Sequence, residues 1–423
     1  MSVVHLVSNR AAGSVVAPPS KSYTHRALVA GHLTGRAYRV VNPLDSADTR
    51  ATARGLSALG TPVHRRRGVW TVGPPSSDHV PPLVRIDCGE SGTTLRFLTA
   101  IAALSDRRVV LRGQGRLPHR PIASLLRALG ALGATARVAP LASAVEVYGP
   151  MHSGRVSLDA SESSQFASAL LFALPTLEGD SVLRLTGPIV SAPYLEATLA
   201  VLARHRVRVE SIARVYRIPG GQRYRGTSFR VPGDASSAAY LWTAGAITGG
   251  KVRVTGLPEK WPQADQAILS LLDQAGAKVT RIADGATVQG PVDRPFSVDL
   301  TDTPDLYPLA GVLAAVVQGH SLLLGASHVA VKESDRKAGT ERVARGLGAH
   351  VRPVPGGLAI EGTDSPRPLS LPDLSDHRMV MSAAVGALAA EGRSSIGDAR
   401  AVDKSFPRFW EVLSRLSGGV EGR

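Results

Sequence analysis

Hydrophobic and polar positions along the chain repeat with a long period. An amphipathic stretch that ends in a tight turn recurs six times, with turns at Gly60, Gly133, His205, Gly276, Gly348 and Gly418. The steps between these turns are 73, 72, 71, 72 and 70 residues. So regular a step indicates six copies of one supersecondary unit.

A second, more apolar stretch lies in the middle of each unit and ends near Gly35, Asp106, Gly179, Gly249, Gly319 and Gly392. Stretches such as 167–174 and 310–317 are hydrophobic on nearly all sides, so they predict helices buried inside a domain. The amphipathic stretches predict helices that face outward. Short β-like segments separate them, so each unit predicts strand–helix–strand–helix–strand, with glycine closing the helices.

Six units divide naturally into three plus three. Consecutive prolines at 18–19 forbid helix there, and Pro232-Gly233 is a second break. We therefore expect an α/β protein with an N-terminal three-repeat domain over residues 18–230. Residues 1–17 together with 231–423 are expected to form the C-terminal three-repeat domain.

Composition narrows the class of protein. The formal net charge is +15, and only seven of the 49 basic residues are lysine. This charge suits either nucleic acid or small anions. The longest basic run is only Arg65–Arg67, and aromatic residues are 4% of the chain. These observations disfavour nucleic acid, although charge alone leaves both readings open.

Several other classes are disfavoured. No apolar run is long enough to span a bilayer, and residues 1–14 lack the pattern of a signal peptide, so we expect a cytoplasmic protein without a membrane partner. The single cysteine, Cys88, excludes an internal disulfide and a multi-cysteine metal site. We expect it to be a buried thiol.

Polar clusters stand at the starts of the predicted buried helices, at 20–22, 90–94, 161–165, 234–237, 303–305 and 375–378. For Ser20, Ser91 and Asp234 simple N-capping is the favoured interpretation. Cations such as Lys21 and Arg378 oppose the helix macrodipole at this place, so they indicate an anion site. The segment 331–336 mixes both charges, and it suits a solvated helix start as well as a catalytic group.

The chain resembles the 5-enolpyruvylshikimate-3-phosphate synthases of the shikimate pathway, which leads to chorismate and the aromatic amino acids. Nine segments carry the resemblance in order: PSKSYTHR at 19–26, GESGTTLR at 89–96, RLPHRP at 116–121, SSQ at 163–165, GDASS at 233–237, PD at 304–305, VKESDR at 331–336, DHRM at 376–379 and KSFP at 404–407. Each alone is weak; all nine in register are specific.

The resemblance implies two similar domains, each of three βαβαββ repeats, forming an inside-out α/β barrel of the enolpyruvyl transferase type. The buried helices would point their N-termini at an active site in the interdomain cleft. The implied enzyme is a transferase that adds the 5-hydroxyl of shikimate 3-phosphate to C2 of phosphoenolpyruvate and then expels phosphate from a tetrahedral intermediate. It would be a monomer with two small-molecule substrates, and without cofactor, metal or nucleic acid.

The resemblance also implies roles for individual residues. The catalytic groups would be Lys21, Asp305 and Glu333. Phosphoenolpyruvate would be bound by Lys21, Gly92, Thr93, Arg120, Gln165, Arg336, Arg378 and Lys404. Shikimate 3-phosphate would be bound by Lys21, Ser22, Arg26, Ser163, Ser164, Gln165, Ser191, Tyr194, Asp305, His328 and Lys332.

Some positions depart from the family pattern. Glu90 and His328 stand where many members carry asparagine, Ala330 stands where many carry arginine, and His119 takes a position that is often acidic. Two alternatives stay open: an enolpyruvyl transferase acting on UDP-N-acetylglucosamine, and an RNA-terminus-processing enzyme of related repeat fold. The first typically uses a loop cysteine, which residues 112–121 lack.

Overall fold

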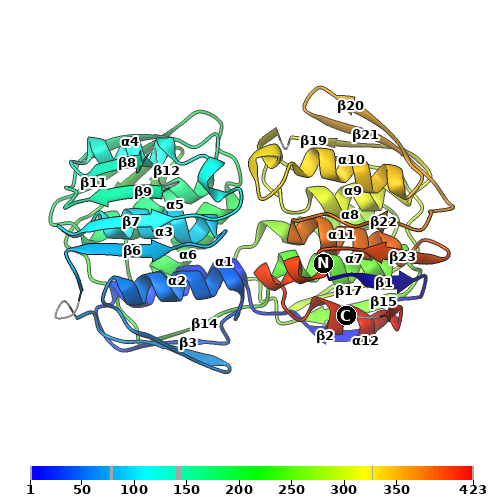
Figure 1. Cartoon of the computed structure of the whole chain (residues 1–423), viewed down its shortest axis with the longest axis horizontal. Coiled ribbons are helices and arrows are strands. Elements are labelled where there is room, and N and C mark those ends of the chain that lie inside the picture. Colours follow the sequence, from blue (N-terminus) through cyan, green and yellow to red (C-terminus); the bar gives the residue numbers. More distant parts are fainter. Residues whose placement is uncertain (1, 77–79, 140–143, 326, 422–423) are drawn as a thin grey trace. The chain divides into compact units, whose positions relative to one another are not determined.

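The structure is a computed structural model that describes residues 2–76, 80–139, 144–325 and 327–421. The chain forms two compact units. Unit 1 comprises Met1–Pro18 and Gly233–Arg423, and unit 2 comprises Pro19–Pro232. In the described part of each unit there are three four-stranded sheets and six α-helices (Figure 1).

The sheets of unit 2 share one strand order. They are β14 (Ser228–Arg230), β3 (Tyr38–Val41), β5 (Val69–Val72) and β4 (Val63–Arg66); β6 (Leu83–Asp87), β7 (Arg108–Arg112), β9 (Ala144–Tyr148) and β8 (Thr135–Ala139); and β10 (Arg155–Asp159), β11 (Ser181–Thr186), β13 (Val215–Ile218) and β12 (Glu210–Ile212).

The sheets of unit 1 follow the same order. They are β2 (Gly13–Val16), β15 (Lys251–Thr255), β17 (Gly285–Gln289) and β16 (Lys278–Ile282); β18 (Ser297–Asp299), β19 (Gly319–Leu324), β21 (Gly357–Gly362) and β20 (His350–Val354); and β22 (Ser370–Leu371), β23 (Arg393–Ile396), β1 (Val4–Val7) and β24 (Val420–Glu421).

In all six sheets the first two strands are parallel and the other two pairings are antiparallel. This shared pattern of strand order and strand direction confirms the predicted α/β fold of six equivalent repeats. Strands β1 and β2 come from the first 16 residues yet complete sheets of unit 1. Strand β14 ends the unit 2 segment and completes the first sheet of that unit.

The helices fall into two groups. The buried helices are α1 (Lys21–Leu33), α3 (Gly92–Ala102) and α5 (Ser164–Ala173) in unit 2, and α7 (Ala235–Ile247), α9 (Tyr307–Ala315) and α11 (His377–Ala387) in unit 1. The outer helices are α2 (Ala47–Ala58), α4 (Ala123–Ala131), α6 (Pro193–Arg204), α8 (Ile268–Gln274), α10 (Arg336–Gly346) and α12 (Phe409–Ser417). Short 3-10 turns cover Leu117–His119, Leu174–Thr176, Ala264–Ala267, Ser327–Val331 and Ala399–Lys404.

The predicted division into buried and outer helices is correct. Every residue of α9 is buried, and so are all residues of α7 except the last. The outer helices bury one face only, against the sheets and the inner helices. An inner helix that is apolar on all sides has no stable place at a water-exposed surface, so the hydrophobic pattern alone fixes this layering.

Three of the predicted helix starts are simple N-caps. The side chains of Ser20, Ser91 and Asp234 accept a hydrogen bond from the backbone N–H three residues on. The fifth start differs from the prediction, because α9 begins only at Tyr307 and has no side-chain cap. Asp305 lies in the turn before it, and its carboxylate is bound by two arginines instead.

The net charge is confined to one unit. Residues 19–232 contain 28 Lys and Arg against 13 Asp and Glu, which gives +15. The rest of the chain contains 21 of each and is formally neutral. Much of the surplus lies on outward faces of the unit 2 sheets, where Arg39, Arg155 and Arg184 are exposed.

The turns that follow the outer helices share a left-handed residue. It is glycine after five of the six helices, but Arg206 takes this place after α6, with φ +59°. The next N–H, of Val207, bonds to the carbonyl of Leu202, as Thr61 does to Leu56 after α2. This is the Schellman pattern, which favours glycine because a Cβ is strained there.

Arg206→Gly should therefore stabilise the protein. Removing the left-handed strain of a non-glycine residue stabilises the folded protein by about 1–2 kcal/mol. Glycine also raises the conformational entropy of the unfolded chain, which offsets part of this stabilisation. We expect a net gain of about 0.5–1 kcal/mol in the free energy of unfolding, measured by chemical denaturation. Gly348→Ala is the reverse control, since its φ is +100° and a Cβ would meet only ordinary contacts. It should lower stability; equal stability of both variants with the parent would contradict this account.

Candidate active site

A buried cluster of opposite charges lies in unit 1. Its members are Asp305, Glu333, Arg336, Asp376, Arg378 and Lys404, here called the arginine–carboxylate cluster. They come from the turn before α9, the segment leading into α10, the start of α11 and the 3-10 turn before α12. Two repeats of the unit therefore contribute to one group.

Arg336 stands at the centre of the cluster, and its side chain is only 1% exposed. Its Nη1 lies 2.6 Å from Asp305 Oδ1, and its Nη2 lies 2.9 Å from Glu333 Oε2. Its Nε donates to Asp376 Oδ2 at 2.9 Å. A guanidinium has five N–H donors, so three carboxylates leave it further donors for an anionic ligand.

Arg378 and Lys404 complete the cluster. Arg378 Nη2 lies 2.8 Å from Asp305 Oδ2, so the two oxygens of Asp305 are held by two different arginines. Lys404 Nζ lies 3.9 Å from Glu333 Oε1. Each carboxylate that the sequence singles out is thus fixed between cations.

The cluster keeps its arginines charged. Burial lowers the pKa of Arg336, but the carboxylates of Asp376, Glu333 and Asp305 more than offset this and raise the pKa above its usual value. Burial likewise lowers the pKa of Arg378, and Asp305 and other acidic neighbours raise it well above normal. Both guanidiniums are therefore cationic at physiological pH.

The sequence does not single out two acidic residues as site residues: Asp376, which belongs to the cluster, and Asp265, which lies near it. Asp376 is fully buried and accepts bonds from Arg336, from Ser334 Oγ at 3.0 Å and from the Arg378 backbone N–H at 2.8 Å. Asp265 is buried beside Ser236, whose hydroxyl donates to it. Burial and the neighbouring Asp305 raise the pKa of Asp265 to about 7.

His328 and Lys332 lie in and just after the 3-10 turn Ser327–Val331. His328 is buried, and neither of its ring nitrogens has a hydrogen-bond partner among the described residues. Burial, together with the charge of Lys332, lowers the pKa of His328 to about 4. The imidazole is therefore neutral at physiological pH, and it can donate or accept a hydrogen bond but not supply a charge.

A second group of predicted residues lies in unit 2, at the starts of the buried helices. Lys21, the first residue of α1, forms an ion pair with Asp48 near the start of α2, with 3.2 Å between Nζ and Oδ2. Both side chains are largely buried. Asp48 is a further residue that sequence reasoning did not single out.

Arg26 is held without any carboxylate. Its guanidinium donates to the carbonyls of Ser22 and Tyr194 at 3.0 and 2.9 Å and to the hydroxyl of Thr198 at 2.9 Å. Burial lowers the pKa of Arg26 to about 10. Tyr194 is the second residue of α6, and its N–H donates to the carbonyl of Ser191. Arg26 thus contacts two other predicted acceptor-binding residues, Ser22 and Tyr194.

Arg96 joins the starts of α3 and α5. It donates to Gln165 Oε1 at 2.7 Å and to the carbonyl of Pro121 at 2.8 Å. Gln165 Nε2 in turn donates to Thr93 Oγ1 at 3.0 Å. Ser163 caps α5, and Ser164 is its first residue.

Gly92 and Arg120 lie in close contact. A Cβ at Gly92 would stand 3.0 Å from the guanidinium carbon of Arg120, so any side chain at this position would displace that arginine. Gly92 is also the first residue of α3, where backbone N–H groups are available to an anion. The remaining predicted phosphoenolpyruvate contacts of unit 2 therefore lie around the start of α3.

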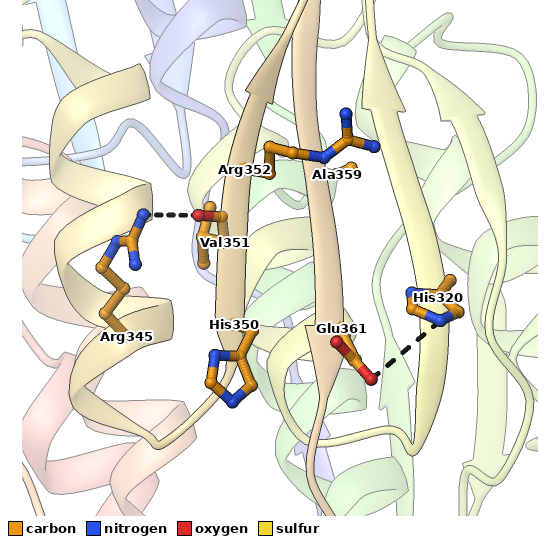
Figure 2. Close-up of a pocket in the computed structure, with 7 residues that line it drawn as sticks. All are labelled: His320, Arg345, His350, Val351, Arg352, Ala359 and Glu361. Carbon is orange, nitrogen blue, oxygen red and sulfur yellow. Dashed lines mark hydrogen bonds and ion pairs between the residues drawn. The ribbon is translucent and has the colours of Figure 1, made fainter.

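A pocket elsewhere in unit 1 contains none of these residues. It lies over strands β19, β20 and β21 and beside α10 (Figure 2). His320 and His350 flank Glu361 in direct cross-strand register, and His320 Nε2 lies 4.0 Å from Glu361 Oε1. The His320 and Glu361 side chains are 83% and 52% exposed, so this row is a solvated sheet face.

The described residues show neither a metal site nor a membrane-spanning helix. No group of three or more His, Cys, Asp or Glu among them is arranged to hold a metal ion. Within the same ranges, no helix combines the length and apolar character needed to cross a membrane. Cys88 is fully buried, as predicted, and burial raises its pKa to about 12.

Comparison with known proteins gives a consistent result. Residues 7–413 match the family described as EPSP synthase (3-phosphoshikimate 1-carboxyvinyltransferase). The 3-phosphoshikimate 1-carboxyvinyltransferase of Halobacterium salinarum is 41% identical over 98% of each chain. The protein of the same name from Methanoculleus marisnigri is 40% identical over 94% of this chain and 95% of its own. The fold is similar to a solved EPSP synthase from Acinetobacter baumannii, with TM-score 0.82, 23% identity and 100% and 99% coverage.

The geometry predicts that Asp376 stabilises unit 1. Asp376→Asn should remove the charge that Arg336 Nε contacts, and breaking a buried ion pair in this way costs about 3–5 kcal/mol. Calorimetry should show a marked fall in the unfolding temperature. Asp373→Asn is the matched control, since Asp373 is 66% exposed and its pair with Arg342 is worth at most about 1 kcal/mol. Equal losses in both variants would refute the role given to Asp376.

Proposed function

Since this chain belongs to the EPSP synthase family, we propose that it transfers the enolpyruvyl group of phosphoenolpyruvate to the 5-hydroxyl of shikimate 3-phosphate. The structural observation that supports this function is the arginine–carboxylate cluster. It holds two carboxylates, Asp305 and Glu333, against cations that can also bind an anionic substrate.

The reaction needs proton transfer at two atoms. The oxygen of the 5-hydroxyl forms a bond to C2 and gives up its proton, while C3 accepts a proton. The tetrahedral intermediate then loses phosphate from C2 and a proton from C3. We assign Asp305 as the base for the hydroxyl, and Glu333 with Lys21 as the acid and base at C3.

The remaining cations bind the two substrates. Phosphoenolpyruvate carries a carboxylate and a phosphate, and the forked guanidiniums of Arg120, Arg336 and Arg378 suit both groups. Lys404, Lys21, Gln165 and the backbone at Gly92 and Thr93 complete its site. For shikimate 3-phosphate the contacts are Ser22, Arg26, Ser163, Ser164, Gln165, Ser191, Tyr194, His328 and Lys332, with Lys21 and Asp305 shared.

These contacts come from both units, so we propose that the domains of residues 18–230 and of 1–17 with 231–423 both bind substrate at an interdomain active site. We also propose that the enzyme is a cytoplasmic monomer. Sedimentation of the purified protein tests the oligomeric state; a stable dimer would refute it. Fractionation of the source cells tests the location.

The sister reaction on UDP-N-acetylglucosamine is not favoured. That enzyme type uses a reactive cysteine, whereas Cys88, the only cysteine, is buried and its thiol is hard to ionise. The decisive experiment measures phosphate release from phosphoenolpyruvate with shikimate 3-phosphate or with UDP-N-acetylglucosamine. Turnover with shikimate 3-phosphate alone supports the proposal, and turnover with the sugar nucleotide alone refutes it. Tight, salt-sensitive RNA binding without phosphate release would favour the RNA-terminus alternative.

The catalytic roles predict a specific kinetic pattern. Glu333→Gln and Asp305→Asn keep the size of the side chains but remove the proton-transfer group, so kcat should fall by about 10²–10⁴-fold. The KM of either substrate should change much less. Glu341→Gln is the control, because it makes the same chemical change on α10. The Glu341 carboxylate accepts hydrogen bonds from Arg345, and the variant should retain normal kcat. Near-normal turnover of Glu333→Gln would remove Glu333 from the mechanism.

The charge of unit 2 predicts salt-sensitive association. Shikimate 3-phosphate is a multiply charged anion, so the field of a +15 unit should raise its kcat/KM at low ionic strength. We expect kcat/KM to fall by about tenfold when added salt shortens the Debye length from about 30 Å to about 8 Å.

Charge variants test the source of this effect. Changing Arg39, Arg155 and Arg184 to glutamine should flatten the salt dependence. Changing Arg253, Arg281 and Arg352 of neutral unit 1, which are equally exposed, should flatten it less. The same slope in both triple variants would show that unit 2 does not steer the substrate.

A further inference from the structure

A chain of hydrogen-bonded side chains runs through the core of unit 2. His25 Nδ1 lies 2.7 Å from Thr52 Oγ1, Thr52 Oγ1 lies 2.7 Å from Thr94 Oγ1, and Thr94 Oγ1 lies 2.7 Å from Ser91 Oγ. These four residues, here called the hydroxyl chain, come from α1, α2, the first turn of α3 and its N-cap. The chain therefore links three helices of unit 2.

The hydroxyl chain is fully sequestered from water. All four residues are at most 1% exposed. Burial and the charges of Lys21 and Arg26 hold the pKa of His25 well below its usual value, so its ring is neutral. Buried hydroxyls and imidazoles cost free energy unless they are hydrogen-bonded, so each member depends on its neighbours.

The fold itself does not require polar residues here. His25 is the fifth residue after the N-cap of α1, and the fifth residue after the N-cap of the equivalent helix α7 is Ala239. Ala239 is just as buried and packs in an apolar core. The polar chain is therefore a particular feature of unit 2, and it needs an explanation beyond the architecture that both units share.

The hydroxyl chain ends at proposed binding groups. Ser91 and Thr94 bracket Gly92 and Thr93, and the Thr94 N–H donates to Ser91 Oγ at 3.2 Å. Thr94 Oγ1 also lies 3.3 Å from the backbone carbonyl of Asp48, whose side chain forms the ion pair with Lys21. One hydroxyl thus touches both the turn that starts α3 and the residue that orients Lys21.

We propose that Thr52 and Thr94 are positioning residues for phosphoenolpyruvate: through the hydroxyl chain they fix Lys21, Gly92 and Thr93 relative to one another. This inference rests on the proposed function for the identity of the ligand. The physical basis is that groups on two helices, α1 and α3, bind one small anion, and that α2 carries the Asp48 that orients Lys21. A misplacement of about 1 Å in such a set costs about a hundredfold in rate.

The first test removes the hydroxyl at Thr52. Thr52→Val keeps the shape but leaves His25 and Thr94 without that partner, and it should raise the KM for phosphoenolpyruvate about tenfold or more. Thr52→Ser restores the hydroxyl and should stay within about twofold of the parent. The KM for shikimate 3-phosphate should change less in both variants, because only Lys21, Ser22 and Arg26 of its proposed contacts lie on the helices of the hydroxyl chain.

A double variant separates positioning from stability. His25→Leu combined with Thr52→Val replaces both polar partners by apolar groups, which restores most of the stability that Thr52→Val loses. We expect its unfolding temperature to recover while its KM for phosphoenolpyruvate stays raised. Thr243→Val is the control. Thr243 is buried in α7, and its hydroxyl has no hydrogen-bond partner among the described residues, so the KM for phosphoenolpyruvate should not change.

The outcomes are distinguishable. A double variant with the parent KM, or a Thr52→Val variant whose only change is in stability, would overturn the positioning role. Absence of phosphate release by the parent protein would instead refute the proposed function. In that event calorimetric binding of phosphoenolpyruvate to the parent and to Thr52→Val still tests the hydroxyl chain, since equal affinities would overturn the proposal as well.

Discussion

The burial of guanidinium groups is the constraint on which the polar clusters of both units depend. Taking Arg336 to 1% exposure removes nearly all of its hydration, so its charge must be matched within the protein. Unit 1 meets this requirement with carboxylates: Asp305, Glu333 and Asp376 surround the group. The consequence is a raised pKa for Arg336 and a cluster in which three carboxylates match three cations.

Unit 2 buries its arginines in another way. Arg26 is held by two carbonyls and a hydroxyl, and Arg96 by Gln165, Ser163 and a carbonyl. The groups around Arg26 are dipoles rather than carboxylates, and burial lowers the pKa of Arg26. The +15 of unit 2 has the same sign as these buried groups. A bound phosphate would supply the charge that the protein does not.

The sequence predicts the fold almost completely, because the six-fold spacing and the two kinds of helix are carried by local patterns. It also predicts which residues stand at helix starts. It does not predict their partners, since Lys21 and Asp48, Arg336 and Asp376, and Thr52 and Thr94 are 27, 40 and 42 residues apart. Such pairs arise only when the helices pack together, within one repeat for Lys21 and Asp48 and between neighbouring repeats for the other two pairs. The start of α9 was placed too early for the same reason, because distant arginines bind Asp305 and remove it from capping.

The two modes of burial suit two different tasks. Cations at a helix N-terminus oppose the macrodipole, and this opposition is relieved by an anion. In unit 1 that anion is already present as Asp305 and Glu333, so the carboxylates are held in place before any ligand arrives and are available for proton transfer. In unit 2 the guanidinium of Arg26 is held by two carbonyls and a hydroxyl. We therefore expect a bound phosphate to supply the negative charge beside Arg26, and the reaction to draw its carboxylates mainly from unit 1.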